Sequence, residues 1–153
     1  MTIDEAVPED LDRLVAIETG AFDPRIYTRM TRRQLRGHIA SGSAVFLVAR
    51  DRAGMAIGYA LGFIKRNNAW LRLYSLAVEP AHQGGRVGAE LFPAIERIAR
   101  ERGLRGVQLE IREDNSKLFE RYSRLGYRPY RTVPDYYPDG AGCIKLKADL
   151  APT

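Results

Sequence analysis

The chain has 153 residues, 45% hydrophobic and 28% charged, with 24 Lys and Arg against 19 Asp and Glu for a net charge of +5. This composition is typical of one globular domain, which we expect over residues 1–153. The single cysteine and the two histidines exclude an intrachain disulfide and a Cys/His zinc site, so we expect no metal.

Charge and hydropathy also limit the partners. The basic residues are scattered from Arg13 to Arg131, usually beside acidic ones, so nucleic-acid binding is not expected. The longest run of apolar and glycine residues, 55–64, has ten residues, whereas a bilayer span needs about 20. The acidic N-terminus, residues 1–10, lacks the pattern of a secretory leader. We therefore expect a cytoplasmic protein with no membrane partner.

The first half of the chain predicts two helices and then a run of strands. A strand is expected at 2–6, and apolar residues at helical spacing predict a helix at 8–18. Thr31 and Gln34 have the spacing of a capping box, which opens a second helix that ends near residue 40. Three consecutive antiparallel strands are then expected at 44–50, 55–65 and 70–78, with turns at 51–54 and 67–68.

The second half alternates helices and strands. A helix is predicted from 86 to 102, ended by Gly103 and kinked at Pro93. In a strand at 107–112, alternation places Glu110 on the face opposite the apolar residues. Asn115 caps a helix that ends before Gly126, and the last strands are expected at 127–133 and 143–146. The predicted order is β-α-α-β-β-β-α-β-α-β-β.

The most informative segment connects the strand at 70–78 to the helix that begins at 86. Gly84, Gly85 and Gly88 lie where the loop opens into the helix. Glycines let a backbone approach a ligand closely, and the N–H groups of a helix N-terminus favour an anion, so the loop suits a phosphate. The alternative is a plain strand-to-helix turn with glycines for packing. Neither GxGxxG nor GxxxxGK[ST] is present.

This segment resembles the signature [RQ]xxGx[GA] of the GNAT superfamily of acetyl-CoA-dependent N-acetyltransferases. Gln83 and Gly88 match it, whereas Arg86 stands at the central glycine and Gly85 lies one residue earlier. The resemblance covers essentially the whole chain. It implies the GNAT fold, an α/β (α+β) architecture with a mixed, mostly antiparallel central sheet flanked by helices.

The resemblance also implies where acetyl-CoA binds. Backbone N–H groups of one strand would hold the acetyl carbonyl and the pantetheine arm, and the glycine-containing loop would hold the pyrophosphate. The residues so implied are Leu76, Ala77, Val78, Gln83, Gly84, Gly85, Arg86, Val87, Gly88 and Ala89.

Three further motifs resemble the RimI-type branch, whose members acetylate protein N-terminal α-amines, notably of ribosomal proteins. They are L-E-I-R-E-D-N at 109–115, Y-S-R-L-G-Y at 122–127 and D-Y-Y-P-D-G at 135–140. The resemblance implies that Glu110 is the general base, Tyr122 the general acid and Asn115 a contact of coenzyme A. The chain continues with A-G-C at 141–143, where the branch has acidic residues.

Elementary chemistry fits these roles. An α-amine has a pKa near 8, so a base must remove a proton at pH 7, and a phenol can protonate a departing thiolate. The structural alternatives are that Glu110 is a surface residue and Tyr122 a core aromatic. Tyr136 and Tyr137 either form a wall for the acceptor or pack a hairpin. Cys143 is expected to be a buried thiol.

We therefore expect an N-acetyltransferase that moves the acetyl group of acetyl-CoA to a primary amine in a ternary complex and releases coenzyme A. A peptide or protein N-terminal α-amine is the preferred acceptor. A small-molecule amine as acceptor and a non-catalytic acyl-CoA-binding module are the alternatives. The chain is expected as a monomer or homodimer.

Overall fold

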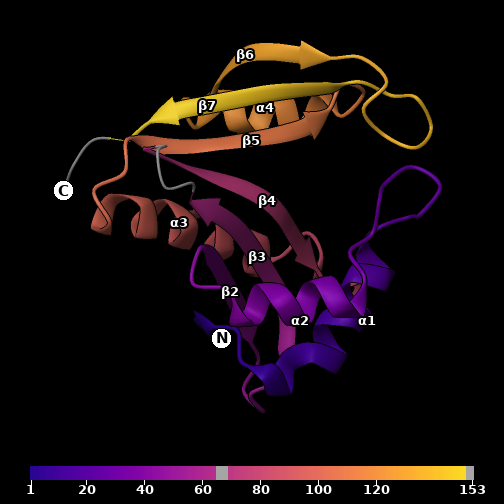
Figure 1. The fold of residues 1–153 in the computed structure, drawn as a ribbon, viewed down its shortest axis with the longest axis vertical. Helices are drawn as coiled ribbons and strands as arrows, with labels where there is room; N and C mark the ends of the chain where they lie inside the picture. The colour runs from indigo at the N-terminus through magenta and orange to yellow at the C-terminus, as the bar shows by residue number, and fades with distance from the viewer. Residues whose placement is uncertain (65–68, 151–153) are drawn as a thin grey trace.

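The computed structural model describes residues 1–64 and 69–150. Within this part of the chain, seven strands form one sheet in the order β1-β2-β3-β4-β5-β7-β6 (Figure 1). β4 and β5 pair in parallel, and every other neighbouring pair is antiparallel. The mixed, mostly antiparallel sheet is therefore confirmed. The strands are β1 (Thr2–Glu5), β2 (Ala44–Arg50), β3 (Ala56–Ile64), β4 (Trp70–Val78), β5 (Gly106–Arg112), β6 (Arg128–Val133) and β7 (Cys143–Asp149).

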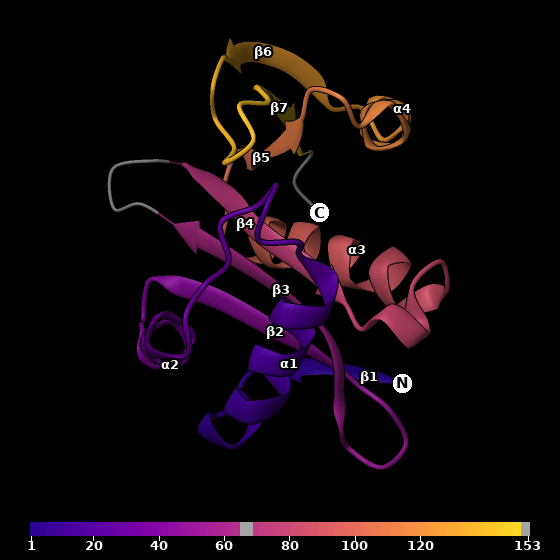
Figure 2. The same cartoon turned by 90° about the vertical axis from the view of Figure 1, so that its right-hand side faces the viewer.

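Helices cover both sides of this sheet. α1 and α2 lie on one side, against β2, β3 and β4, and α3 lies on the other side. Figure 2 shows α4 on the same side as α3. No helix in residues 1–64 and 69–150 combines the length and the apolar character needed to cross a membrane. The helices are α1 (Leu11–Ala21), α2 (Arg32–Ala40), α3 (Arg86–Glu101) and α4 (Ser116–Arg124).

An apolar core lies on each side of the sheet. Leu14 of α1 and Leu35 of α2 pack with Tyr59 of β3 on one side. Leu91 and Ile95 of α3 pack against the strands on the other side. Each fully buried side chain of this size contributes roughly 1.5–3 kcal/mol. Because an apolar core packs against each side, the sheet can hold a site rigidly at its edge or between its strands.

Local signals set the helix ends as predicted. The Thr31 hydroxyl accepts a hydrogen bond from the Gln34 amide at 3.1 Å, and the Gln34 side chain accepts one from the Thr31 amide at 2.8 Å. The Asn115 side chain accepts a hydrogen bond from the amide of Leu118 at 3.2 Å. Gly103 and Gly126 follow α3 and α4 with φ of 67° and 94°, a conformation that glycine adopts readily.

The boundaries differ from the prediction in a few places. The first helix begins with a 3-10 turn at Pro8–Asp10 and then runs to Ala21, beyond the predicted end. The Asp10 carboxylate accepts the Val7 amide at 2.9 Å and pairs with Arg50, which fixes that first turn. The last strand extends to Asp149 because it pairs with β5 along its whole length. Pro93 lies inside α3, and its kink stays a prediction. The predicted turn at 67–68 and the strand end at 65 lie outside the described residues.

The sheet opens in its middle, and this opening positions the site. β4 and β5 pair only where Trp70–Arg72 lies beside Gly106–Gln108. Beyond that point, no strand in residues 1–64 and 69–150 pairs with the β5 side of β4. A bulge at Tyr74 adds to the distortion, since Leu61 of β3 pairs with Ser75 while the next residue pairs with Leu73. A cleft therefore forms between the diverging ends of two buried strands.

Candidate active site

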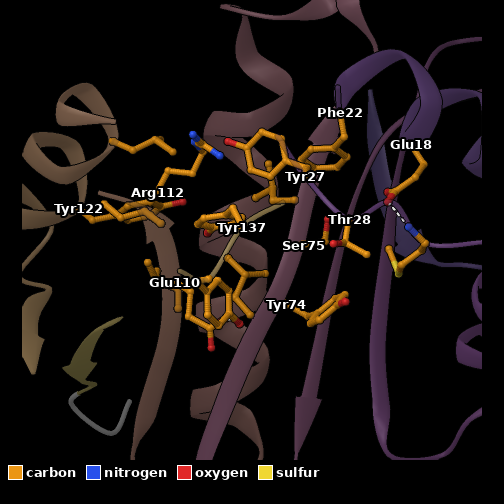
Figure 3. Close-up of a pocket in the computed structure, with 17 residues that line it drawn as sticks. Glu18, Phe22, Tyr27, Thr28, Tyr74, Ser75, Glu110, Arg112, Tyr122 and Tyr137 are labelled. Carbon is orange, nitrogen blue, oxygen red and sulfur yellow. Dashed lines mark hydrogen bonds between the residues drawn. The ribbon is translucent and has the colours of Figure 1, made fainter. Parts of the chain in front are cut away.

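A cavity of about 360 Å³ lies in the opening between β4 and β5 (Figure 3). Its lining comes from both strands, from α1, from α4, from the segment between α1 and α2, and from the loop between β6 and β7. Five residues singled out in the sequence are brought together here. They are Leu76, Glu110, Tyr122, Tyr136 and Tyr137.

Tyr122 supplies the apolar side of the cavity. It projects from α4 into an aromatic cluster, with ring centres 5.1 Å from Phe92 and 5.8 Å from Tyr127 in edge-on contacts. Burial raises the pKa of the Tyr122 phenol above its usual value, an effect that Arg121 opposes and Glu96 reinforces. The hydroxyl therefore stays protonated at neutral pH, as a proton donor must.

Glu110 supplies a charged side. Its carboxylate accepts two hydrogen bonds of 3.0 Å from Arg72 and one of 2.8 Å from the Tyr136 hydroxyl. The ammonium of Lys145 lies 3.7 Å from the same carboxylate. Burial acts to raise the pKa of Glu110, but these hydrogen bonds and positive charges outweigh it and leave the pKa below its usual value. Glu110 is therefore ionised at neutral pH, and its side chain is only 15% exposed.

Aromatic rings form the side of the cavity that faces the loops. Tyr137 contacts Tyr27 at 5.5 Å and Tyr136 at 5.1 Å between ring centres, and Tyr27 in turn contacts Phe22. Tyr27 comes from the segment between α1 and α2, whereas Tyr136 and Tyr137 come from the loop between β6 and β7. Tyr136 is 40% exposed; burial of part of its ring and then its hydrogen bond to Glu110 raise its pKa to about 12.

Arg112 holds these two loops together. Its guanidinium donates to the carbonyl of Ile26 at 2.8 Å and to the Asp139 carboxylate at 2.7 Å, and it also pairs with Asp114. The same group lies over the rings of Tyr27 and Tyr137, at 5.5 and 5.0 Å. Its side chain is only 6% exposed. One buried cation thus fixes the distance between the walls of the cavity.

Glu18 closes the far end of the cavity, where Figure 3 shows it beside Ser75 and Thr28. Its carboxylate accepts the Met30 amide at 2.7 Å and the Tyr59 hydroxyl, which also lies 3.0 Å from the Ser75 hydroxyl. These bonds tie the segment that follows α1 to β3 and β4. Because Glu18 is 3% exposed, hydrogen bonds must replace its lost hydration.

The glycine-containing loop lies at the start of α3. Gly84 has φ of 79° and Gly85 precedes the first residue of the helix. The Gln83 side chain donates to the carbonyl of Val78 at 3.0 Å, which ties the loop to the end of β4. Arg86, at the position of the signature glycine, pairs with Glu90 at 3.1 Å and is highly exposed. Among the described residues, no side chain caps the backbone N–H groups at this helix end.

Several residues that line the cavity or contact Glu110 are not singled out by the sequence. Arg72 and Lys145 reach Glu110 from neighbouring strands, which only the strand pairing reveals. Arg112 lies within the L-E-I-R motif at 109–112, so the motif itself was a signal for it. Glu18 and Tyr27 carried no signal. Cys143 is buried, as predicted, and burial raises the pKa of its thiol.

Comparison with protein families decides the assignment. The model of the acetyltransferase (GNAT) family matches residues 11–127, more than half of the chain. The chain belongs to the GNAT family. The predicted acetyl-CoA-dependent N-acetyltransferase is thereby confirmed at the level of the family.

Two curated relatives and one crystal structure are similar over most of this chain. Mycothiol acetyltransferase of Propionibacterium freudenreichii is 30% identical over 145 residues, which cover 90% of this chain and 46% of the relative. The chain thus spans about half the length of that GNAT protein. An uncharacterized N-acetyltransferase of Methanocaldococcus jannaschii is 30% identical over 150 residues, 95% of this chain and 90% of the relative.

The ribosomal-protein-S18-alanine N-acetyltransferase of Escherichia coli has a similar crystal structure. The TM-score is 0.84 at 19% identity, and the match covers 99% of this chain and 95% of that one. This likeness confirms the predicted GNAT fold, with the order of helices and strands expected from the sequence.

Proposed function

We propose that the chain transfers an acetyl group from acetyl-CoA to a primary amine, preferably the α-amine of a peptide or protein. The observation that carries the proposal is the cavity that Glu110 and Tyr122 line together. A carboxylate kept ionised and a phenol kept protonated are the proton acceptor and donor that acyl transfer to an amine requires. The fold shared with a ribosomal-protein-alanine N-acetyltransferase favours a protein acceptor.

Acetyl-CoA supplies the acetyl group as an activated thioester, and the described residues fit it. A Cβ at Gly84 would meet no atom within 4 Å, and one at Gly88 would meet only Val78, at 3.7 Å. The loop thus leaves space beside the uncapped N–H groups at the start of α3, where we assign the pyrophosphate. We assign the acetyl carbonyl to the backbone N–H groups of residues 76–78, beyond the last pair of β4 with β5. Asn115 would hold the start of α4 beside the cofactor.

The proton transfers follow from the two sides of the cavity. Glu110 accepts a proton from the ammonium of the acceptor, directly or through a water. The amine nitrogen then bonds to the acetyl carbon as the carbon–sulfur bond breaks, and Tyr122 donates its proton to the departing sulfur. The second proton of the amine replaces the one that Tyr122 gave. One proton is released to solvent for each acetyl group transferred.

A small-molecule amine is the second candidate acceptor. The 30% identity to mycothiol acetyltransferase, whose name implies a small acceptor, favours it. A non-catalytic acyl-CoA-binding module is the third reading. It gives no reason for a carboxylate that can accept a proton and a phenol that can donate one to line the same cavity.

A panel of acceptors separates these readings. Purified protein with acetyl-CoA is offered peptides with free N-termini, the same peptides blocked at the N-terminus but containing lysine, and small amines. Coenzyme A release and the mass of each product are measured. We expect acetylation of the free α-amine peptides alone. Turnover confined to small amines would overturn the acceptor assignment, and acetyl-CoA binding without turnover of any amine would overturn the transferase assignment.

A further inference from the structure

The face of the sheet away from α3 is partly open to solvent next to Glu110, where the side chains of Arg72 and Lys145 are 35% and 23% exposed. Leu109 of β5 and Leu146 of β7 belong to the core under α3. Because side chains alternate along a strand, Glu110, Lys145 and Lys147 lie on the opposite face. Lys145 pairs directly with Glu110 across the two strands, and Lys147 lies two residues further along β7.

Arg72 extends this surface onto β4. Its neighbours Leu71 and Leu73 point into the core, so Arg72 lies on the open face with Lys145 and Lys147. We call these three residues, Arg72, Lys145 and Lys147, the basic strip. The strip begins beside Glu110, which lines the cavity, and follows the paired part of β4, β5 and β7 away from the opening.

The strip carries more positive charge than its own carboxylate balances. Arg72 lies 2.8 Å and Lys145 3.7 Å from the same oxygen of Glu110, so two cations share one carboxylate. Lys147 adds a third cation. Because the positive charge of the strip is not fully balanced and lies beside the cavity, the strip attracts an anionic group on an acceptor that enters the cavity.

Lys147 is held in place by aromatic rings. Its ammonium lies 4.7 Å from the ring centre of Tyr130 and 5.3 Å from that of Trp70. Across residues 1–64 and 69–150, no Asp or Glu oxygen lies within 4 Å of that ammonium. The rings stabilise the cation without neutralising it, so it can still pair with an incoming carboxylate.

We propose that the basic strip selects acceptor peptides that carry Asp or Glu at position 2 or 3. The inference rests on the proposed function, because it names the acceptor class of that same cavity. Lys147 lies about 7 Å along β7 from Lys145, at roughly 3.4 Å per residue. An extended peptide advances about 3.3–3.6 Å per residue, so with its amine at Glu110 its second and third residues reach the strip. A free amino acid with its amine at Glu110 would not reach Lys147.

The test uses peptides that differ at one position only. Each has a free α-amine and Asp, Asn or Lys at position 2 or 3, and one control carries Asp at position 6. Free aspartate is a further arm. We expect kcat/KM for Asp at position 2 or 3 to exceed that for Asn by about three- to tenfold, with the preference shrinking in 0.5 M salt. Lys147→Gln should reduce the Asp-to-Asn ratio toward one, and so should Lys145→Gln. Arg97→Gln, an exposed charge on α3, should leave that ratio unchanged.

The outcomes separate this inference from the proposed function. Equal rates for Asp, Asn and Lys peptides would overturn the inference while leaving peptide acetylation intact. A ratio that persists in both strip variants, or a preference that follows Asp to position 6, would also overturn it. If free aspartate were acetylated and no peptide were, the claim that the acidic acceptor is a peptide would be overturned. No transfer to any amine would instead contradict the proposed function.

Discussion

The two sides of the cavity differ in what surrounds their titratable groups. Tyr122 lies among aromatic rings, and burial raises its pKa. Glu110 lies between Arg72, Lys145 and Tyr136, and these partners lower its pKa against the effect of burial. The two environments thus reinforce the opposite protonation states that these two groups have at neutral pH in one 360 Å³ cavity. Environments that separate the pKa values of a pair assign the acid and the base.

Replacing Tyr122 by Phe tests the apolar side and has the largest expected effect. A general acid contributes typically about 10²- to 10⁴-fold, so kcat should fall within that range while acetyl-CoA affinity stays nearly unchanged. Tyr127→Phe is the matched control, because that phenol lies in the same cluster but donates to Glu96 at 2.9 Å. Steady-state rates and calorimetry with acetyl-CoA give the two readouts. Equal losses in both variants would assign Tyr122 to packing.

Gly88→Val tests the assigned binding site of the acetyl-CoA pyrophosphate at the start of α3. A Cβ at this position would meet Val78 at an ordinary 3.7 Å, so the fold tolerates it. A bulky side chain in front of the helix start would instead crowd the pyrophosphate, and acetyl-CoA affinity should fall about 10- to 100-fold. Gly37→Val, at an open position on α2, is the control. Unchanged calorimetric affinity in a folded variant would move the pyrophosphate elsewhere.

Arg112→Leu tests what holds the two loops of the cavity wall together, the segment between α1 and α2 and the loop between β6 and β7. The substitution removes the bonds to Ile26 and Asp139 and the contacts with Tyr27 and Tyr137. We expect Tm to fall by about 4–8 °C and KM for the acceptor to rise more than KM for acetyl-CoA. Arg112→Lys keeps the charge but not the forked geometry, so it should restore only part of both. Equal changes in the two KM values would mean that Arg112 does not position the acceptor side specifically.

The fold was predictable because its signals are local. The Thr31–Gln34 capping box and the glycines after α3 and α4 act within a few residues, and the sequence shows them directly. The glycine-containing loop before α3 was also predictable, since Gly84, Gly85 and Gly88 lie together in the chain, while its role in binding acetyl-CoA stays a proposal. The start of the first helix was harder to predict from the sequence, because Asp10 is held by Arg50, which lies 40 residues away in the chain.

The environment of Glu110 was not predictable, since it depends on which strands become neighbours. Arg72 reaches Glu110 only because β4 and β5 pair in parallel, and Lys145 only because β7 pairs with β5 in this register. The sequence pattern placed Glu110 on the correct face but left its partners unknown. Those partners decide its charge, so they bear directly on its chemistry.

Replacing Glu110 by Gln tests the charged side, with the smallest expected effect. Gln can still accept hydrogen bonds from Arg72 and Tyr136 but cannot take a proton. Because the pKa of Glu110 is below its usual value, the carboxylate stays ionised from pH 6 upward, and any pH dependence arises from the acceptor amine. Asp149→Asn, on the same face at the end of β7, controls for a change of charge alone.

The most direct measurement is kcat/KM from about pH 6 to pH 9.5 for the wild type and Glu110→Gln with one α-amine peptide. The neutral amine fraction rises about tenfold per pH unit until pH 8 is passed, and a neutral amine attacks without a base. The account predicts about a tenfold loss in Glu110→Gln at pH 6 that shrinks as pH rises. Profiles that run parallel across this range would contradict the assignment of Glu110 as the proton acceptor.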